Sequence, residues 1–196
     1  MKPWALAIAC LALVGAPAGW FVTDRLEADD AFCTSCHLDA ATPLHRENSA
    51  DFAAHPAVSL AAAHAAAGND AHEDGAFRCI DCHGGTGLLG RARVKLLSAR
   101  DAFWYATGRF EEPEGMHWPL QDADCRRCHA SFAPPVQIRA DPAFHELGVH
   151  NRALGVACVS CHLSHRRDVL RDFHMLQPAV VRAQCARCHP EYEEGP

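Results

Sequence analysis

Ten of the eleven cysteines in this chain fall into five copies of one short pattern, Cys-x-x-Cys-His. The paired cysteines are Cys33 and Cys36, Cys79 and Cys82, Cys125 and Cys128, Cys158 and Cys161, and Cys185 and Cys188. The histidines that follow them directly are His37, His83, His129, His162 and His189. This pattern is the attachment signature of c-type haem, in which both thiols bond to the porphyrin and the histidine binds the iron. The sequence therefore predicts five covalently bound haem c groups, with these histidines as proximal iron ligands.

A Cys-x-x-Cys pair alone also fits a redox-active dithiol, half of a zinc site, or cysteines shared between two disulfides. None of these alternatives requires a histidine directly after the second cysteine. Structural zinc would also need the motifs in pairs, and five is an odd number. Haem is therefore the preferred interpretation of all five motifs.

The second axial ligand of each iron is predicted to be a histidine. Of the fourteen histidines, nine lie outside the motifs, whereas Met116 and Met175 are the only methionines after Met1. Ligation by two histidines favours lower reduction potentials than ligation by histidine and methionine. The predicted distal ligands, in order of preference, are His165, His150, His64, His117 and His174, ahead of His45 and His55. His64 and His117 are expected on helices that precede a motif.

The amino terminus carries an uncharged apolar segment from Pro3 to Val22. About 20 such residues can span a bilayer as a helix, so residues 1–24 are predicted to be a membrane anchor and residues 25–196 an exported haem domain. A cleaved signal peptide is the alternative, since Ala16-Pro17-Ala18 has the form of a cleavage site. Trp20 favours the anchor because tryptophan is common at membrane interfaces. Both hypotheses export the haem domain, and we expect a bacterial inner-membrane protein with that domain in the periplasm.

Composition predicts a mostly helical chain with extensive loops and almost no sheet. Only 8% of residues are aromatic, and there are 12 prolines and 13 glycines, so haems would supply much of the apolar core. The net charge of −6 makes nucleic acid an unsuitable partner. Helices are expected at Ala53–Ala67 and Leu88–Gly108. The basic residues of the second helix would form a solvated face, or alternatively contact haem propionates or lipid head groups; they are Arg91, Arg93, Lys95 and Arg100.

Several stretches resemble the NapC/NirT family of membrane-anchored multihaem cytochromes. They are Gly19-Trp-Phe with Asp29-Asp-Ala-Phe32 before motif 1, the run from Phe77 through Arg91–Gly108 to His129, and His150 with Gly155–His165. The carboxyl half equally resembles the periplasmic carriers of the NrfB/MtrA type. In those carriers Cys-x-x-Cys-His-x-x-His precedes a last motif after a short helix, as from Cys158 to His189. Together the two resemblances cover nearly the whole chain.

The NapC/NirT resemblance implies a link that oxidises membrane quinol for periplasmic reductases, and the NrfB/MtrA resemblance implies a carrier between proteins. Two features depart from the NapC/NirT pattern. Members of that family usually have methionine two residues past the first motif, where this chain has Asp39. Their basic unit also holds four haems, whereas here a fifth motif follows closely. Both departures concern the quinol site and leave the chain of haems intact.

We therefore expect a membrane-anchored pentahaem cytochrome that carries electrons from the quinol pool or a membrane donor to a periplasmic redox partner. Quinol would bind near His37 and Asp24–Asp30, whose carboxylates could accept its protons; alternatively they are exposed charges beside an anchor. One alternative function is a reductase with one open haem position, for a nitrogen or sulfur oxyanion. Another is a relay subunit of a larger respiratory complex. No catalytic side chain is predicted.

Overall fold

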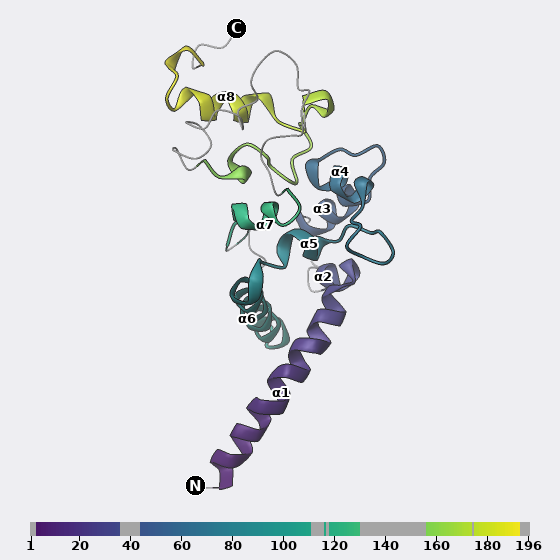
Figure 1. The fold of residues 1–196 in the computed structure, drawn as a ribbon, viewed down its shortest axis with the longest axis vertical. Coiled ribbons are helices and arrows are strands. Elements are labelled where there is room, and N and C mark those ends of the chain that lie inside the picture. Colours follow the sequence, from purple (N-terminus) through teal and green to yellow (C-terminus); the bar gives the residue numbers. More distant parts are fainter. Residues whose placement is uncertain are drawn as a thin grey trace. The chain divides into compact units, whose positions relative to one another are not determined.

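The computed structural model describes residues 3–35, 44–110, 116, 118–129, 156–173 and 175–192, with side chains for all of these except 3, 6–12, 44 and 45. This part of the chain consists mostly of helices and loops (Figure 1). Its only β-structure is an isolated bridge between Leu170 and Leu176. The predicted mostly helical fold with almost no sheet is confirmed.

The chain folds as two compact units. Unit 1 comprises Met1–Arg46 and Arg78–Glu114, and unit 2 comprises Glu47–Phe77 and Gly115–Pro196. The first two Cys-x-x-Cys-His motifs fall within unit 1 and the other three within unit 2. The exported domain predicted over residues 25–196 is thus divided between the two units.

Unit 1 begins with helix α1 (Pro3–Glu27), which contains the whole uncharged segment from Pro3 to Val22. Among the residues that the structure describes, no helix is long and apolar enough to cross a membrane. A short turn leads to α2 (Asp30–Ser35). The Asp29 carboxylate caps α2 by accepting a hydrogen bond from the Ala31 N–H at 2.9 Å.

Helices α5 (Cys79–His83) and α6 (Gly87–Ala106) complete unit 1. The turn between them requires glycine at Gly85, where φ is +72° and a Cβ atom would lie 2.6 Å from the Gly90 carbonyl oxygen. The turn therefore holds the second motif close to the start of α6. Helix α6 confirms the helix expected at Leu88–Gly108, and it ends before Gly108, whose φ is +69°.

Unit 2 contains most of α3 (Leu44–Phe52), then α4 (Leu60–Ala67), α7 (Asp122–Arg126), η3 (Cys158–Ser160), η4 (Arg171–Phe173), α8 (Pro178–Ala186) and η5 (Pro190–Tyr192). The helix expected at Ala53–Ala67 begins only at Leu60, so the first half of that prediction is wrong. Pro56 lacks the N–H that a helix interior needs. Ser59 then caps α4 by accepting a hydrogen bond from the Ala62 N–H at 3.2 Å.

Polar contacts fix the segment after the fourth motif to α4 and to the loop that precedes it. The Ser164 carbonyl accepts a hydrogen bond from the Ala61 N–H at 2.8 Å. The Arg171 guanidinium donates two hydrogen bonds to the Ala57 carbonyl, at 2.8 and 2.7 Å. These bonds keep the fourth motif and helix α4 within one compact structure.

The polypeptide itself buries little apolar surface. In the described part of the chain, the buried apolar side chains are Ala62 and Met175. Several large apolar side chains are exposed, among them Leu88 at 76% and Leu89 at 86%. The thin apolar core expected from the composition is therefore present. Polar contacts stabilise each of the two units from within.

Candidate functional site

The five motifs, numbered 1 to 5 in chain order, begin at Cys33, Cys79, Cys125, Cys158 and Cys185. Motif 2 forms helix α5. In motifs 3, 4 and 5, the carbonyl of the first cysteine accepts a hydrogen bond from the second cysteine at 3.2 Å and from the histidine at 2.9–3.0 Å. Each of these four motifs is therefore a single helical turn. Of motif 1, Cys33 lies in α2, whereas Cys36 and His37 lie outside the described residues.

Local sequence explains why these turns form. In motif 2 the Asp81 carboxylate accepts a hydrogen bond from the Arg78 N–H at 2.8 Å, which caps α5. Asp124 does the same for the Gln121 N–H at 2.9 Å at the start of α7. Motif 5 continues α8, which begins with Pro178, a residue that needs no N–H partner in the first turn.

A helical turn has a direct chemical consequence for Cys-x-x-Cys-His. Residues three and four positions apart lie on the same face of a helix. The first cysteine, the second cysteine and the histidine occupy positions i, i+3 and i+4, so both thiols and the imidazole share one face. Covalent attachment of a macrocycle through two thioethers, with the imidazole beneath its metal, needs this arrangement of side chains. The residues present therefore fit c-type haem.

Burial and nearby carboxylates raise the pKa of several of these thiols. Burial, followed by the charge and hydrogen bond of Asp30, raises the pKa of Cys79 to about 12. Burial and the hydrogen bond of Asp122 raise the pKa of Cys158 to about 12, and burial and Asp30 raise that of Cys33 to about 11. These three thiols are therefore protonated at neutral pH in the chain without a bound group.

Cysteines of consecutive motifs lie close together within each unit. In unit 2 the thiols of Cys125 and Cys158 are hydrogen-bonded, and Cys185 lies close enough to Cys161 to influence its ionisation. In unit 1 Cys33, the first cysteine of motif 1, influences the ionisation of Cys79, the first cysteine of motif 2, in the same way. The structure therefore brings together cysteines of motifs 1 and 2, of motifs 3 and 4, and of motifs 4 and 5.

One predicted distal ligand faces a proximal histidine. His64 lies on α4, as expected, and its ring centroid is 5.9 Å from that of His129 in motif 3, with the two rings nearly perpendicular at 86°. The Nδ1 atom of His64 is 2.9 Å from the Leu60 carbonyl oxygen, to which it donates as the Nδ1–H tautomer. This hydrogen bond leaves Nε2 as the atom able to bind a metal. Phe77 packs against His64, with the two ring centroids 5.2 Å apart.

The other distal candidates are less informative. His165 lies in the turn that follows motif 4, with an exposed side chain. His117, His150 and His174 lie outside the described residues, so their predicted roles and the helix expected at His117 remain predictions.

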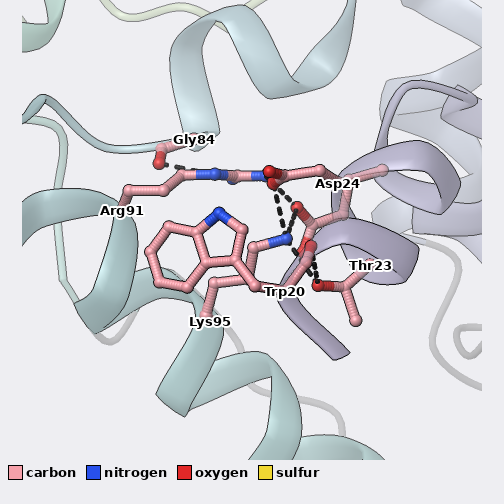
Figure 2. Close-up of polar contacts among 7 residues, drawn as sticks. Trp20, Thr23, Asp24, Gly84, Arg91 and Lys95 are labelled. Atoms are coloured by element: carbon pink, nitrogen blue, oxygen red, sulfur yellow. Dashed lines mark hydrogen bonds and ion pairs between the residues drawn. The ribbon is translucent and has the colours of Figure 1, made fainter. Parts of the chain in front are cut away.

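An ion-pair cluster joins α1 to α6 within unit 1 (Figure 2). The Lys95 ammonium lies 2.7 Å from Asp24, 2.8 Å from Glu27 and 2.6 Å from the Thr23 hydroxyl. The Arg91 guanidinium pairs with the same two carboxylates. Only 8% of the Glu27 side chain is exposed, so this carboxylate is largely desolvated. Two carboxylates and two cations make the cluster neutral.

The same cluster also contacts the chain directly after motif 2, and Trp20, which lies near the end of the uncharged segment of α1. Arg91 also donates a hydrogen bond to the carbonyl of Gly84, the residue after motif 2, at 3.5 Å. The Lys95 ammonium lies 5.7 Å from the centre of the Trp20 ring, a cation–π contact. The cluster thus fixes the end of α1 beside the second motif, and sequence reasoning missed it.

This cluster changes two expectations from the sequence. Arg91 and Lys95 were expected on a solvated helix face, or in contact with haem propionates or lipid head groups. Instead, both side chains form ion pairs with carboxylates of α1. Burial raises the pKa of Asp24, but the hydrogen bonds and charges of Lys95 and Arg91 outweigh it and lower that pKa below its ordinary value of 3.8. An ionised, paired carboxylate is a weak base at neutral pH. Asp24 is therefore a poor acceptor for quinol protons.

No family model, curated protein or solved structure matches the chain. In the described ranges, no group of three or more His, Cys, Asp or Glu side chains is arranged to hold a metal ion by itself.

Replacing Glu27 with glutamine tests the ion-pair cluster. Glu27→Gln should lower the free energy of unfolding by about 3 kcal/mol, because it leaves two cations with one carboxylate in a largely buried setting. Urea denaturation followed by far-ultraviolet circular dichroism measures this change. Asp29→Asn is the matched control, since it removes an exposed charge nearby but keeps an oxygen to cap α2, and it should change stability by less than about 0.5 kcal/mol. Equal stability of the two variants would contradict the assigned role of the cluster.

Proposed function

We propose that this chain is a pentahaem c-type cytochrome that carries electrons from a membrane donor to a periplasmic redox partner. The observation that carries the proposal is the helical turn of motifs 2 to 5, which sets two thiols and one imidazole on a common face. The five copies of the motif supply the number of haems. When bound, haem supplies one-electron redox chemistry at its iron, and the protein controls its ligands and surroundings.

In this proposal each motif has the same division of labour. The two cysteines form the thioether bonds, and the histidine binds the iron as the proximal ligand, at His37, His83, His129, His162 and His189.

We assign His64 as the distal partner of His129. The ring centroids of the two histidines lie 5.9 Å apart, close enough for both imidazoles to hold the same iron if haem binds at motif 3. The hydrogen bond from Nδ1 to Leu60 fixes the His64 ring and directs Nε2 as the ligand atom. His165, His150, His117 and His174 stay as proposals for the other distal positions.

The order of the motifs suggests the route of the electron within each unit. Attachment points are adjacent between motifs 1 and 2 in unit 1, and between motifs 3 and 4 and then 5 in unit 2. Neighbouring haems in that order would form a short conducting chain. The protein would fix the spacing by holding the attachment turns together.

Membrane attachment is part of the proposal and rests on the uncharged sequence Pro3–Val22. The charged end of α1, with Asp24 and Glu27 paired to α6, would then mark the membrane surface on the periplasmic side of a bacterial inner membrane. Motifs 1 and 2 belong to the same unit as α1 and would receive the electron from a donor in the membrane. The donor would be quinol or a membrane protein, and the acceptor a periplasmic redox protein.

Replacing His64 tests the ligand assignment. His64→Leu should convert one ferric haem of the five from low spin to high spin, because its iron loses an axial nitrogen. Electron paramagnetic resonance of the oxidised protein detects this change. Phe77→Leu is the control, since it removes the ring that packs on His64 but no ligand, and it should leave every haem low spin. A low-spin His64→Leu protein would refute the assignment, and a high-spin signal in the wild type would favour the reductase alternative.

Direct reduction by quinol tests the donor. Oxidised protein in detergent, mixed rapidly with a menaquinol analogue, should show the reduced-haem absorption band, and an inhibitor of quinone sites should abolish this reduction. Dithionite serves as the control because it reduces every haem without a quinol site. A protein that dithionite reduces but quinol does not would be an electron carrier supplied by another protein.

A further inference from the structure

Motifs 1 and 3 share a feature that the other motifs lack. Each has an aspartate three residues before its first cysteine, in the sequences Asp30-Ala-Phe-Cys33 and Asp122-Ala-Asp-Cys125. The corresponding residues of motifs 2, 4 and 5 are Ala76, Gly155 and Arg182. The repeated aspartate therefore marks the first and third motifs.

The two aspartates make the same long-range contact. Asp30 accepts a hydrogen bond through Oδ1 from the N–H of Cys79, the first cysteine of motif 2, at 2.8 Å. Asp122 accepts one through Oδ1 from the N–H of Cys158, the first cysteine of motif 4, also at 2.8 Å. Both bonds are partly buried, and they span 49 and 36 residues of sequence. In each unit, the aspartate of one motif thus holds the first residue of the next.

The packing of short helices follows the same pairing. Helix α2 packs against α5 in unit 1, and α7 packs against η3 in unit 2. Each aspartate lies one helical turn before the first cysteine of its own motif, on the same face. One carboxylate therefore links its own attachment turn to the next and keeps the two first cysteines side by side.

The backbone bond is the part of this contact that haem attachment preserves. Each aspartate also hydrogen-bonds to the thiol of the cysteine that it holds. A thioether has no S–H group and cannot donate, whereas the N–H is unaffected by attachment. The bond from N–H to carboxylate therefore persists in the loaded protein, where it also places a negative charge beside two attachment turns.

We propose that Asp30 and Asp122 are positioning residues that set the geometry of two haem pairs, one held by motifs 1 and 2 and the other by motifs 3 and 4. The chain is then two copies of one two-haem arrangement, with motif 5 added after the second. The inference rests on the proposed function, since it requires haem at these motifs. It also identifies the repeating unit: the linkers differ, with first cysteines 46 and 33 residues apart, but the aspartate contact is the same.

Substitutions in the haem-loaded, detergent-solubilised protein test the inference. Asp30→Ala should retain five haems but lose amplitude in the Soret circular dichroism couplet, which reports coupling between neighbouring haems. Asp30→Asn should restore the couplet because its Oδ1 still accepts the Cys79 N–H. The loss of negative charge should shift haem reduction potentials upward in both variants. Asp29→Asn is the matched control, because it removes a neighbouring negative charge but keeps an oxygen to cap α2, and its couplet should match the wild type.

Asp122→Ala should reproduce the loss for the second pair, and the Asp30 and Asp122 effects should add in the double variant because they act on separate pairs. A wild-type couplet in Asp30→Ala or Asp122→Ala overturns the inference. If the Asp30→Ala variant loses haem, the Asp30→Asn variant decides the question. Recovery of both the haem and the couplet in Asp30→Asn supports positioning by the hydrogen bond, and failure to recover them overturns the inference. The haem content of the wild type is measured first. A wild type without five haems would contradict the proposed function, independently of the result for the aspartate variants.

Discussion

The period of the helical turn is the constraint on which the whole arrangement depends. With 3.6 residues per turn, positions i, i+3 and i+4 share a face, whereas in an extended strand the cysteines would point to opposite sides. Motifs 2 to 5 are such helical turns, and capping by Asp81 and Asp124 starts two of them. These turns are too short to be stable helices alone, so contacts with other segments must hold them.

Polar contacts between distant segments do this holding, because the polypeptide has little apolar core in the part that the structure describes. Asp30 and Asp122 join consecutive motifs, and Arg171 fixes the segment after motif 4 to the loop before α4. The cluster around Glu27 joins the end of α1 to α6 beside motif 2. Buried ion pairs contribute modestly to net stability, but they penalise alternative arrangements that would leave one charge without its partner. Attached porphyrins would add the apolar surface that such a framework lacks.

Local patterns in the sequence predicted local structure well. The motifs, the helical class and helix α6 all follow from spacing within a few residues. The helix expected from Ala53 begins only at Leu60, because Pro56 prevents a helix before it despite the many alanines. Contacts between distant residues were not predictable: Glu27 and Lys95 are 68 residues apart, and nothing in either segment identifies the other. The repeated aspartate before motifs 1 and 3 was a visible signal, but its partner became evident only from the structure. Likewise, sequence ranked His64 among the distal ligands without pairing it to a particular iron.

The most direct test of the central claim is the mass of the denatured, purified chain, expressed in cells that mature c-type cytochromes. Covalent attachment at every motif predicts the polypeptide mass plus five haems, with no motif cysteine open to alkylation. Peptide analysis should then find one haem on each Cys-x-x-Cys-His segment. A chain with the bare polypeptide mass, whose motif thiols all react with an alkylating agent, would contradict the account.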